Sequence, residues 1–169
     1  MSAPQPSIFE RIASVHVAAF GKAYRGKANA AAVMVSAHNP TKAEQAALEA
    51  SLLQLGYAKS ALGWALVDAD GTGEEKDQKD SAERLFNLIE GIDPLCVCAL
   101  DHATCAALSR SYNTPLALES KTLLLGRECR CFENLDALLS TEAGKRKTWN
   151  LLKTLPKLGQ PFGRHCFPY

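Results

Sequence analysis

Apolar side chains recur at helical spacing in five segments of the chain, which predicts five helices. These segments are residues 7–20, 42–55, 80–90, 102–112 and 141–155. The first carries an apolar stripe of residues three or four apart, namely Ile8, Ile12, Val15 and Ala19. Two helices begin with residue pairs spaced as capping boxes, Thr41 with Glu44 and Asp80 with Glu83.

Short apolar runs lie between these helices and predict strands at 30–37, 63–67 and 95–100, with a strand pair at 118–125 and 127–132. The run 30–37 is continuously apolar, which is typical of a parallel strand covered on both faces. Strands that alternate with helices predict a three-layer α/β/α fold with a mainly parallel central sheet of about four strands. We expect one domain over 1–169, because a chain of this length fits one core and no linker interrupts it.

Composition narrows the class of protein only a little. Of the 169 residues, 47% are hydrophobic and 22% are charged, and the formal net charge is +1. A charge so close to zero gives no general attraction for a polyanion. The N-terminus lacks a basic region followed by an apolar core, and the longest near-apolar stretch, 28–37, is too short to span a membrane. We therefore expect a cytoplasmic protein with no membrane partner.

Two segments are expected to lack regular structure. Residues 68–80 hold six acids and two lysines and no large apolar side chain, which predicts a mobile acidic loop. Their spacing does not fit an EF-hand calcium loop. The tail, 156–169, is predicted to be irregular, and a short basic stretch, 22–27, follows the first helix.

The six cysteines admit two interpretations. Cys96 with Cys98, and Cys129 with Cys131, stand two residues apart in predicted strands, so each pair shares one face of the sheet. Neighbouring strands could bring four thiolates together, but a structural zinc site usually has a Cys-x₂₋₄-Cys knuckle, which this sequence lacks. We favour reduced core cysteines and predict no metal, with Cys166 as the candidate for exposure.

Polar residues follow the predicted parallel strands at the edge where α/β proteins hold their ligands. His38 and Asn39 come after the strand 30–37, and Asp101 comes after the strand 95–100. An imidazole titrates near neutral pH, an amide can bind a base edge, and a carboxylate can transfer protons. These three are therefore the candidate catalytic residues. The candidate ligand contacts beside them are Ser36, Thr41 and His102.

A structural interpretation of the same residues stays open. Asn39 and Asp101 precede helices and are of the types preferred as helix caps, and His38 and His102 can be loop or surface residues. The sequence has no P-loop, Gly-x-Gly-x-x-Gly or Gly-x-Ser-x-Gly motif, so no cofactor is predicted.

Positive charge is concentrated near the carboxyl end, where 141–169 carry a net charge of about +5. The candidate nucleic-acid contacts in this region are Lys145, Arg146, Lys147 and Lys153. Trp149, Phe162 and Tyr169 could stack on bases beside them. The alternative is a solvated helix face whose tryptophan points inward.

Two segments carry a resemblance to a known family. Residues 85–103 run from a helix through Ile92-Asp93-Pro94 into a strand that ends Ala99-Leu100, and a helix follows. This order resembles the middle of the uracil-DNA glycosylase-like superfamily. The segment 144–153 resembles the family's final helix with its lysines and tryptophan. The resemblance implies a three-layer fold and a DNA or nucleotide ligand.

The motifs that carry the family's chemistry are not matched. The segment 36–40 lacks the glycines and acid that the family places after the first strand, and 132–136 lacks the histidine that stabilises the departing base. Asp101 stands where the family usually has glycine, and the cysteine spacing of the iron–sulfur members is absent. The psi subunit of the bacterial DNA polymerase III holoenzyme resembles this fold and acts by protein contact.

Three hypotheses follow. The first is a divergent, non-catalytic member of the glycosylase-like fold that binds DNA, a nucleotide or a protein of the DNA machinery. The second is an enzyme on the same scaffold that acts on a nucleobase or nucleotide through His38, Asn39 and Asp101. The third is an interaction module whose last helix and tail bind a protein partner.

Overall fold

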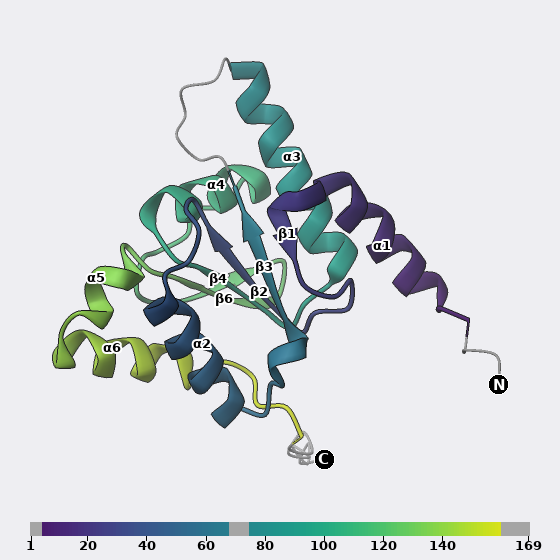
Figure 1. Ribbon diagram of the computed structural model, residues 1–169. Coiled ribbons are helices and arrows are strands. Elements are labelled where there is room, and N and C mark those ends of the chain that lie inside the picture. The colour runs from purple at the N-terminus through teal and green to yellow at the C-terminus, as the bar shows by residue number, and fades with distance from the viewer. Residues whose placement is uncertain (1–4, 68–74, 160–169) are drawn as a thin grey trace, which may run out of the picture.

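The computed structural model describes residues 5–67 and 75–159. Its centre is a mixed sheet of six strands in the order β1-β3-β2-β4-β6-β5 (Figure 1). The strands are β1 (Tyr24–Arg25), β2 (Ala32–Ser36), β3 (Leu62–Leu66), β4 (Cys96–Ala99), β5 (Lys121–Leu124) and β6 (Arg127–Cys131). The α/β class is confirmed, and the sheet is wider than the four strands expected.

The four inner strands are parallel to one another, since β2 pairs in parallel with β3 and β4, and β4 with β6. The outer strands β1 and β5 each pair antiparallel with their neighbour. Strand β1 was not predicted, because two residues are too few to show an alternating pattern. The strand pair β5 and β6 was predicted, and it turns at Leu125 and Gly126, both with positive φ.

Six α-helices accompany the sheet in the described ranges. They are α1 (Ile8–Phe20), α2 (Lys42–Gln54), α3 (Glu75–Ile92), α4 (His102–Tyr112), α5 (Leu135–Leu139) and α6 (Glu142–Leu152). Two short 3₁₀ turns, η1 (Gly21–Ala23) and η2 (Lys59–Ala61), precede β1 and β3. The five predicted helices are present, and α5 is an additional short helix that Asn134 caps.

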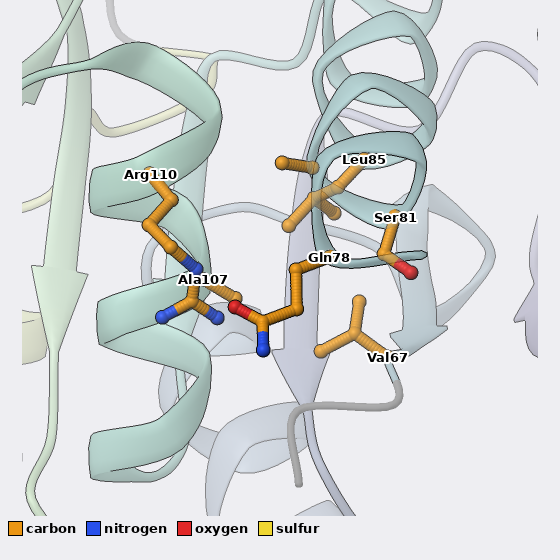
Figure 2. A pocket seen from close by; sticks show the side chains of 7 residues that line it. Val67, Gln78, Ser81, Leu85, Ala107 and Arg110 are labelled. Carbon is orange, nitrogen blue, oxygen red and sulfur yellow. The ribbon is translucent and has the colours of Figure 1, made fainter. Parts of the chain in front are cut away.

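Helices cover both faces of the sheet, because alternate strand residues enter two separate cores. Val33 and Val35 of β2 pack with α1, α3 and α4 in one core. Ala32 and Met34 pack with α2, α5 and α6 in the other. The polar groups at the ends of the inner strands therefore lie between two helical layers. A small cavity of about 30 Å³ lies between α3 and α4. Gln78 and Arg110 are among the residues that line it (Figure 2).

Helix α3 corrects the prediction of an acidic loop at 68–80. Residues 75–80 form its first turns, so Asp80 lies inside the helix rather than at its start. These turns form the end of α3 that projects furthest in Figure 1. Glu, Lys and Gln are good helix formers, which favours a helix here despite the acidic composition. Residues 68–74 lie outside the described ranges.

Helix α1 packs against α3 through a close contact at Gly91. A Cβ atom at Gly91 would lie 2.5 Å from Cδ2 of His16, so only glycine leaves room for the imidazole ring. His16 is therefore a packing residue. The apolar stripe that predicted α1 is not part of this contact, because Ile8, Ile12 and Val15 are exposed.

The two cysteine pairs lie on opposite faces of the sheet. Cys96 and Cys98 belong to the core with α2, and Cys129 and Cys131 belong to the core with α3. The register explains this, because Cys129 pairs with Val97, between the two cysteines of β4. The four thiols therefore cannot converge on one metal ion. All five cysteines in the described ranges are buried and free, and Cys166 lies outside those ranges.

In the part of the chain that the structure describes, no helix combines the length and apolar character needed to cross a membrane. Of the predicted irregular tail, residues 156–159 form no helix or strand. Residues 160–169, which include Phe162 and Tyr169, lie outside the described ranges.

Candidate functional site

Asp101 stands at the carboxyl end of β4 and joins two elements. Its Oδ1 accepts a hydrogen bond of 2.8 Å from the backbone N–H of Thr104 and so caps α4. Its Oδ2 accepts a bond of 2.9 Å from the N–H of Ala37, directly after β2. Ser36, which is buried, points its hydroxyl at the same oxygen from 3.5 Å. Both carboxylate oxygens of Asp101 are thus occupied by structural contacts.

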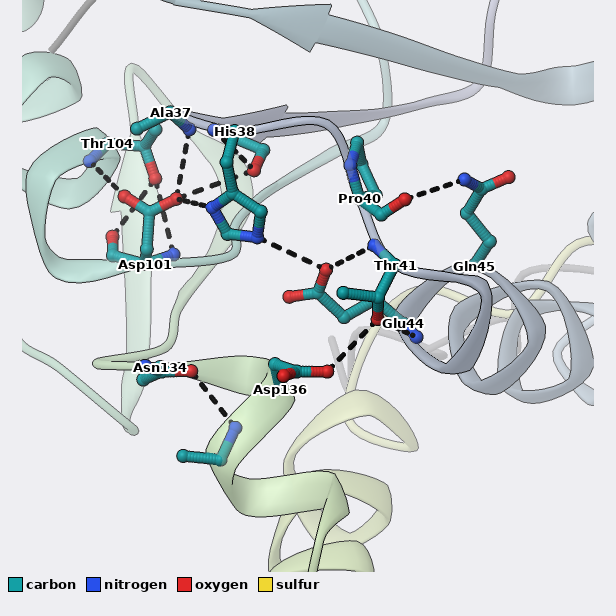
Figure 3. A network of polar contacts seen from close by, with 12 residues as sticks. Ala37, His38, Pro40, Thr41, Glu44, Gln45, Asp101, Thr104, Asn134 and Asp136 are labelled. Atoms are coloured by element: carbon teal, nitrogen blue, oxygen red, sulfur yellow. Dashed lines mark hydrogen bonds and ion pairs between the residues drawn. The ribbon is translucent and has the colours of Figure 1, made fainter.

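His38 lies between two carboxylates (Figure 3). Its Nδ1 is 3.7 Å from Oδ2 of Asp101, and its Nε2 is 3.3 Å from Oε2 of Glu44. About half of the His38 side chain is exposed, whereas that of Glu44 is fully buried. The imidazole is therefore accessible from solvent while both ring nitrogens face acids. The structure brings His38 and Asp101 together, as expected for residues at neighbouring strand ends.

Glu44 and Thr41 form the predicted capping box at the start of α2. The N–H of Thr41 donates to Oε2 of Glu44 over 2.8 Å, and Thr41 Oγ1 accepts from the N–H of Glu44 over 3.1 Å. The Thr41 hydroxyl also donates to Asp136 of α5. Oε1 of Glu44 is buried and has no hydrogen-bond partner within the described ranges. Thr41 is thereby the cap of α2, a role that the sequence also allowed for Asn39.

Asn39 faces a different space from His38. It lines a cavity of about 70 Å³ beside Pro40, next to the middle of β2 and the second half of β3. The remaining lining residues come from η1, β1, β2 and β3; they are Lys22, Ala23, Arg25, Met34, Trp64, Ala65 and Leu66. We call this the cationic cavity, because it is lined by Lys22 and Arg25 and by no acidic side chain. The three candidate catalytic residues are therefore divided between two places.

A second cavity of about 160 Å³ adjoins the cationic cavity, since Ala23 and Leu66 line both. Its other walls include Phe20 and Arg84. The guanidinium of Arg84 lies 5.6 Å from the centre of the Phe20 ring and donates to the Phe20 carbonyl oxygen. The Arg84 guanidinium is thus bound to the end of α1. The second cavity is mainly apolar.

His102, a candidate ligand contact, belongs neither to the cluster of His38, Asp101 and Glu44 nor to the lining of the cationic cavity. It is the first residue of α4, and its backbone N–H donates to the carbonyl of Glu133 over 2.8 Å. Its side chain is exposed, and its ring makes no hydrogen bond or ion pair with any described residue. His102 therefore does not converge with His38 on a common ligand position.

The cations of α6 are partly neutralised. Lys145 pairs with Glu142 at 2.7 Å, and Lys147 pairs with Glu119. Trp149 packs against the core with α2, which matches the inward orientation that the sequence left open. Arg146 and Lys153 are exposed and have no ion pair in the described ranges. Arg146 of α6 and Lys153, the residue that caps its carboxyl end, are thus two unpaired cations, and Trp149 is half-buried against the same core as Trp64.

Comparison with known proteins adds no constraint on function. No protein-family model matches the chain, and no curated protein matches it either.

Sequence reasoning missed the residues that make the cationic cavity. Lys22 and Arg25 were visible as a basic stretch, and Trp64 as one residue of a strand. No local signal joins them, because the antiparallel pairing of Arg25 with Trp64 is what brings β1 beside β3. The loop after β2, which carries Asn39, then completes the cavity.

Proposed function

We propose that this chain is a divergent, non-catalytic glycosylase-like domain that binds a nucleotide, free or within a DNA strand, at the cationic cavity. The observation that carries the proposal is the joint lining of that cavity by two cations, an indole and an amide, namely Lys22, Arg25, Trp64 and Asn39. Among described residues, neither Lys22 nor Arg25 has an ion pair, so both charges are free to meet a phosphate.

Each of these side chains has a matching part of a nucleotide. Lysine and arginine bind phosphate oxygens, and an arginine can do so with two parallel hydrogen bonds. An indole stacks on the flat face of any base, and a terminal amide can pair with a base edge. Trp64 and its pairing partner Arg25 lie beside the middle of β3. Asn39 reaches the same cavity from the loop at the carboxyl end of β2, which is the edge where parallel sheets hold ligands.

The hydrogen bonds of Asp101 and the position of Asn39 support the non-catalytic part of the proposal. Both oxygens of Asp101 accept structural hydrogen bonds, which leaves that carboxylate poorly placed to act as a base. Asn39 lines the cationic cavity rather than the space beside His38. The segments behind the family resemblance also form a helix, strand and helix in the implied order, which supports the glycosylase-like part.

The test is binding of a labelled single-stranded oligonucleotide to the full chain, followed by fluorescence anisotropy at fixed salt. We expect Lys22→Glu with Arg25→Glu to weaken binding by about tenfold or more, because two phosphate contacts become repulsions. Competition by a nucleoside monophosphate measures how much of the affinity one nucleotide supplies. Trp64→Leu should weaken binding while leaving its salt dependence unchanged, since stacking releases no counterions.

The matched control is Arg146→Glu with Lys153→Glu, which reverses the same number of charges on α6 and its C-cap. If the α6 pair abolishes binding and the cavity pair does not, the ligand lies on α6 and the proposed site is wrong. Excision of uracil from single-stranded DNA that is lost in His38→Ala would contradict the non-catalytic half and favour the enzyme hypothesis.

A further inference from the structure

Helix α1 exposes a row of large apolar side chains that no other element of the described ranges covers. The exposed fractions are 67% for Ile8, 79% for Phe9, 48% for Ile12 and 66% for Val15. The adjoining side of the helix packs on the molecule through Ala13, Val17 and Phe20. The remaining exposed large hydrophobics within the described ranges are scattered over α2, β5 and loops. The gathering on α1 is therefore a distinct apolar face.

The spacing of this face is that of a helix–helix seam. Ile8, Ile12, Val15 and Ala19 stand four, three and four residues apart, which is the a/d alternation of a two-stranded coiled coil. A seam of this kind is complementary to another helix of the same spacing. The capping box of Ser7 and Glu10 and the close packing on α3 hold the helix in place before any partner arrives.

We propose that this face pairs with α1 of a second copy of the chain, giving a symmetric antiparallel dimer. In that arrangement Ile8 meets Ala19 of the second copy and Ile12 meets Val15, so the same four residues serve both sides of a two-fold axis. The flanking positions hold Phe9 and His16 on one side and Arg11 and Ala18 on the other. Antiparallel pairing sets Arg11 against Ala18, so no like charges face each other.

The amount of apolar surface fits a dimer of modest affinity. Covering the four residues and the flanking Phe9 on both copies removes on the order of 1,000 Å² from water, which is the lower limit for a specific interface. A membrane surface fits the helix less well. Interfacial helices carry many Lys and Arg on their polar face, and α1 has Arg11 as its only such residue, beside Glu10.

The test is sedimentation equilibrium of the full chain over a range of concentrations. We expect a monomer–dimer equilibrium, and Ile8→Glu with Val15→Glu should raise the dissociation constant by about tenfold or more. Both positions are solvent-exposed on a helix, so circular dichroism and the melting temperature should stay close to those of the wild type. Leu123→Glu, which changes a leucine of the edge strand β5 that is 55% exposed, is the control and should leave the dimer intact.

Three results would overturn the dimer. The first is a wild-type chain that stays monomeric at every concentration. The second is a dimer that Leu123→Glu dissociates and the α1 variant does not. The third is a monomer that co-sediments with phosphatidylcholine–phosphatidylserine vesicles through Ile8 and Val15, which would assign the face to a membrane. None of these outcomes depends on nucleotide binding at the cationic cavity.

Discussion

His38 and Glu44 are linked across the start of α2, with Nε2 of the exposed imidazole 3.3 Å from Oε2 of a fully buried carboxylate. The same oxygen accepts the backbone N–H of Thr41, so it is shared between a helix cap and a ring. The link connects the loop that carries Asn39 with the first turn of α2. Its two ends are unequal in structural importance, because only Glu44 also holds a backbone group.

We predict that Glu44→Ala lowers the free energy of unfolding by about 1–2 kcal/mol, since it removes the capping partner of Thr41 and leaves a void in the core. His38→Ala should cost less, because the capping box survives without the ring. Urea unfolding of both variants measures the difference. A larger loss in His38→Ala than in Glu44→Ala would contradict this view of the pair.

Asp101 gives a second prediction, because it holds backbone N–H groups from two elements. Asp101→Ala should destabilise the protein by about 2 kcal/mol or more, through the lost cap of α4 and the unpaired N–H of Ala37. Asp101→Asn keeps one acceptor oxygen and should cost less. Chemical denaturation compares the two, and equal stability of Asp101→Ala and wild type would show that the carboxylate has no structural role.

The pattern of the sequence was enough to predict the layered α/β architecture, but not the arrangement of residues at the candidate site. Periodicity located the inner strands and five helices, and the capping box of Thr41 and Glu44 was predicted correctly from spacing alone. Contacts between residues that are far apart in the sequence leave no comparable pattern in it. The contact of Arg25 with Trp64 depends on β1, a strand of two residues, and the separation of the cysteine pairs depends on the register of β4 against β6.

Helix faces were also predicted less well than helix positions. Apolar spacing locates a helix but does not say which of its sides finds a partner. In α1 the predicted stripe faces outward. In α2 the buried residues are Glu44, Leu48 and Leu52, one of them charged. Burial depends on neighbours from distant segments, which a local pattern does not contain.

Arg130 is predicted to be a major contributor to stability. Its side chain is fully buried in β6, pairs with Glu128 at 2.8 Å and donates to the hydroxyl and carbonyl of Thr154 after α6. Arg130→Ala should cost about 3–5 kcal/mol, because it leaves polar groups without partners and opens a cavity. Glu128→Gln should cost less, about 1–3 kcal/mol, because an amide oxygen can still accept a hydrogen bond but the buried guanidinium loses its ion-pair partner. Thermal and urea unfolding provide the comparison.

Alkaline pH should destabilise the fold, because a buried thiol and a buried phenol keep their protons in the native state and lose them in the unfolded chain. Burial raises the pKa of the Cys96 thiol from 9.0 to about 12, and burial also raises the pKa of Tyr24 from 10.0 to about 12. The native state keeps these protons while the unfolded chain releases them. Stability should therefore fall as the pH rises from about 9 toward 12, by up to about 1.4 kcal/mol per pH unit for each group.

The measurement is urea unfolding at a series of pH values between 8 and about 11, a window that lies within the two shifts. Cys96→Ala removes one of the two groups and should make the decline shallower. A decline that is identical in Cys96→Ala and wild type would mean that the thiol titrates equally in both states.

For Gly144→Ala we predict a change in the free energy of unfolding that is opposite in direction to that of an ordinary glycine-to-alanine substitution in a helix. Gly144 lies in the first turns of α6, where replacing glycine with alanine normally stabilises a helix by about 0.5–1 kcal/mol. Here a Cβ atom would overlap the carbonyl oxygen of Leu138 in α5, so the two helices can approach only at a glycine. Gly144→Ala should therefore destabilise the protein by about 1–3 kcal/mol, the cost of overpacking. The matched change Ala143→Gly lies in the same turn at a solvent-exposed position. It should cost only the ordinary difference in helix propensity between alanine and glycine. If Gly144→Ala instead raises the free energy of unfolding, α5 and α6 are not in contact at this point.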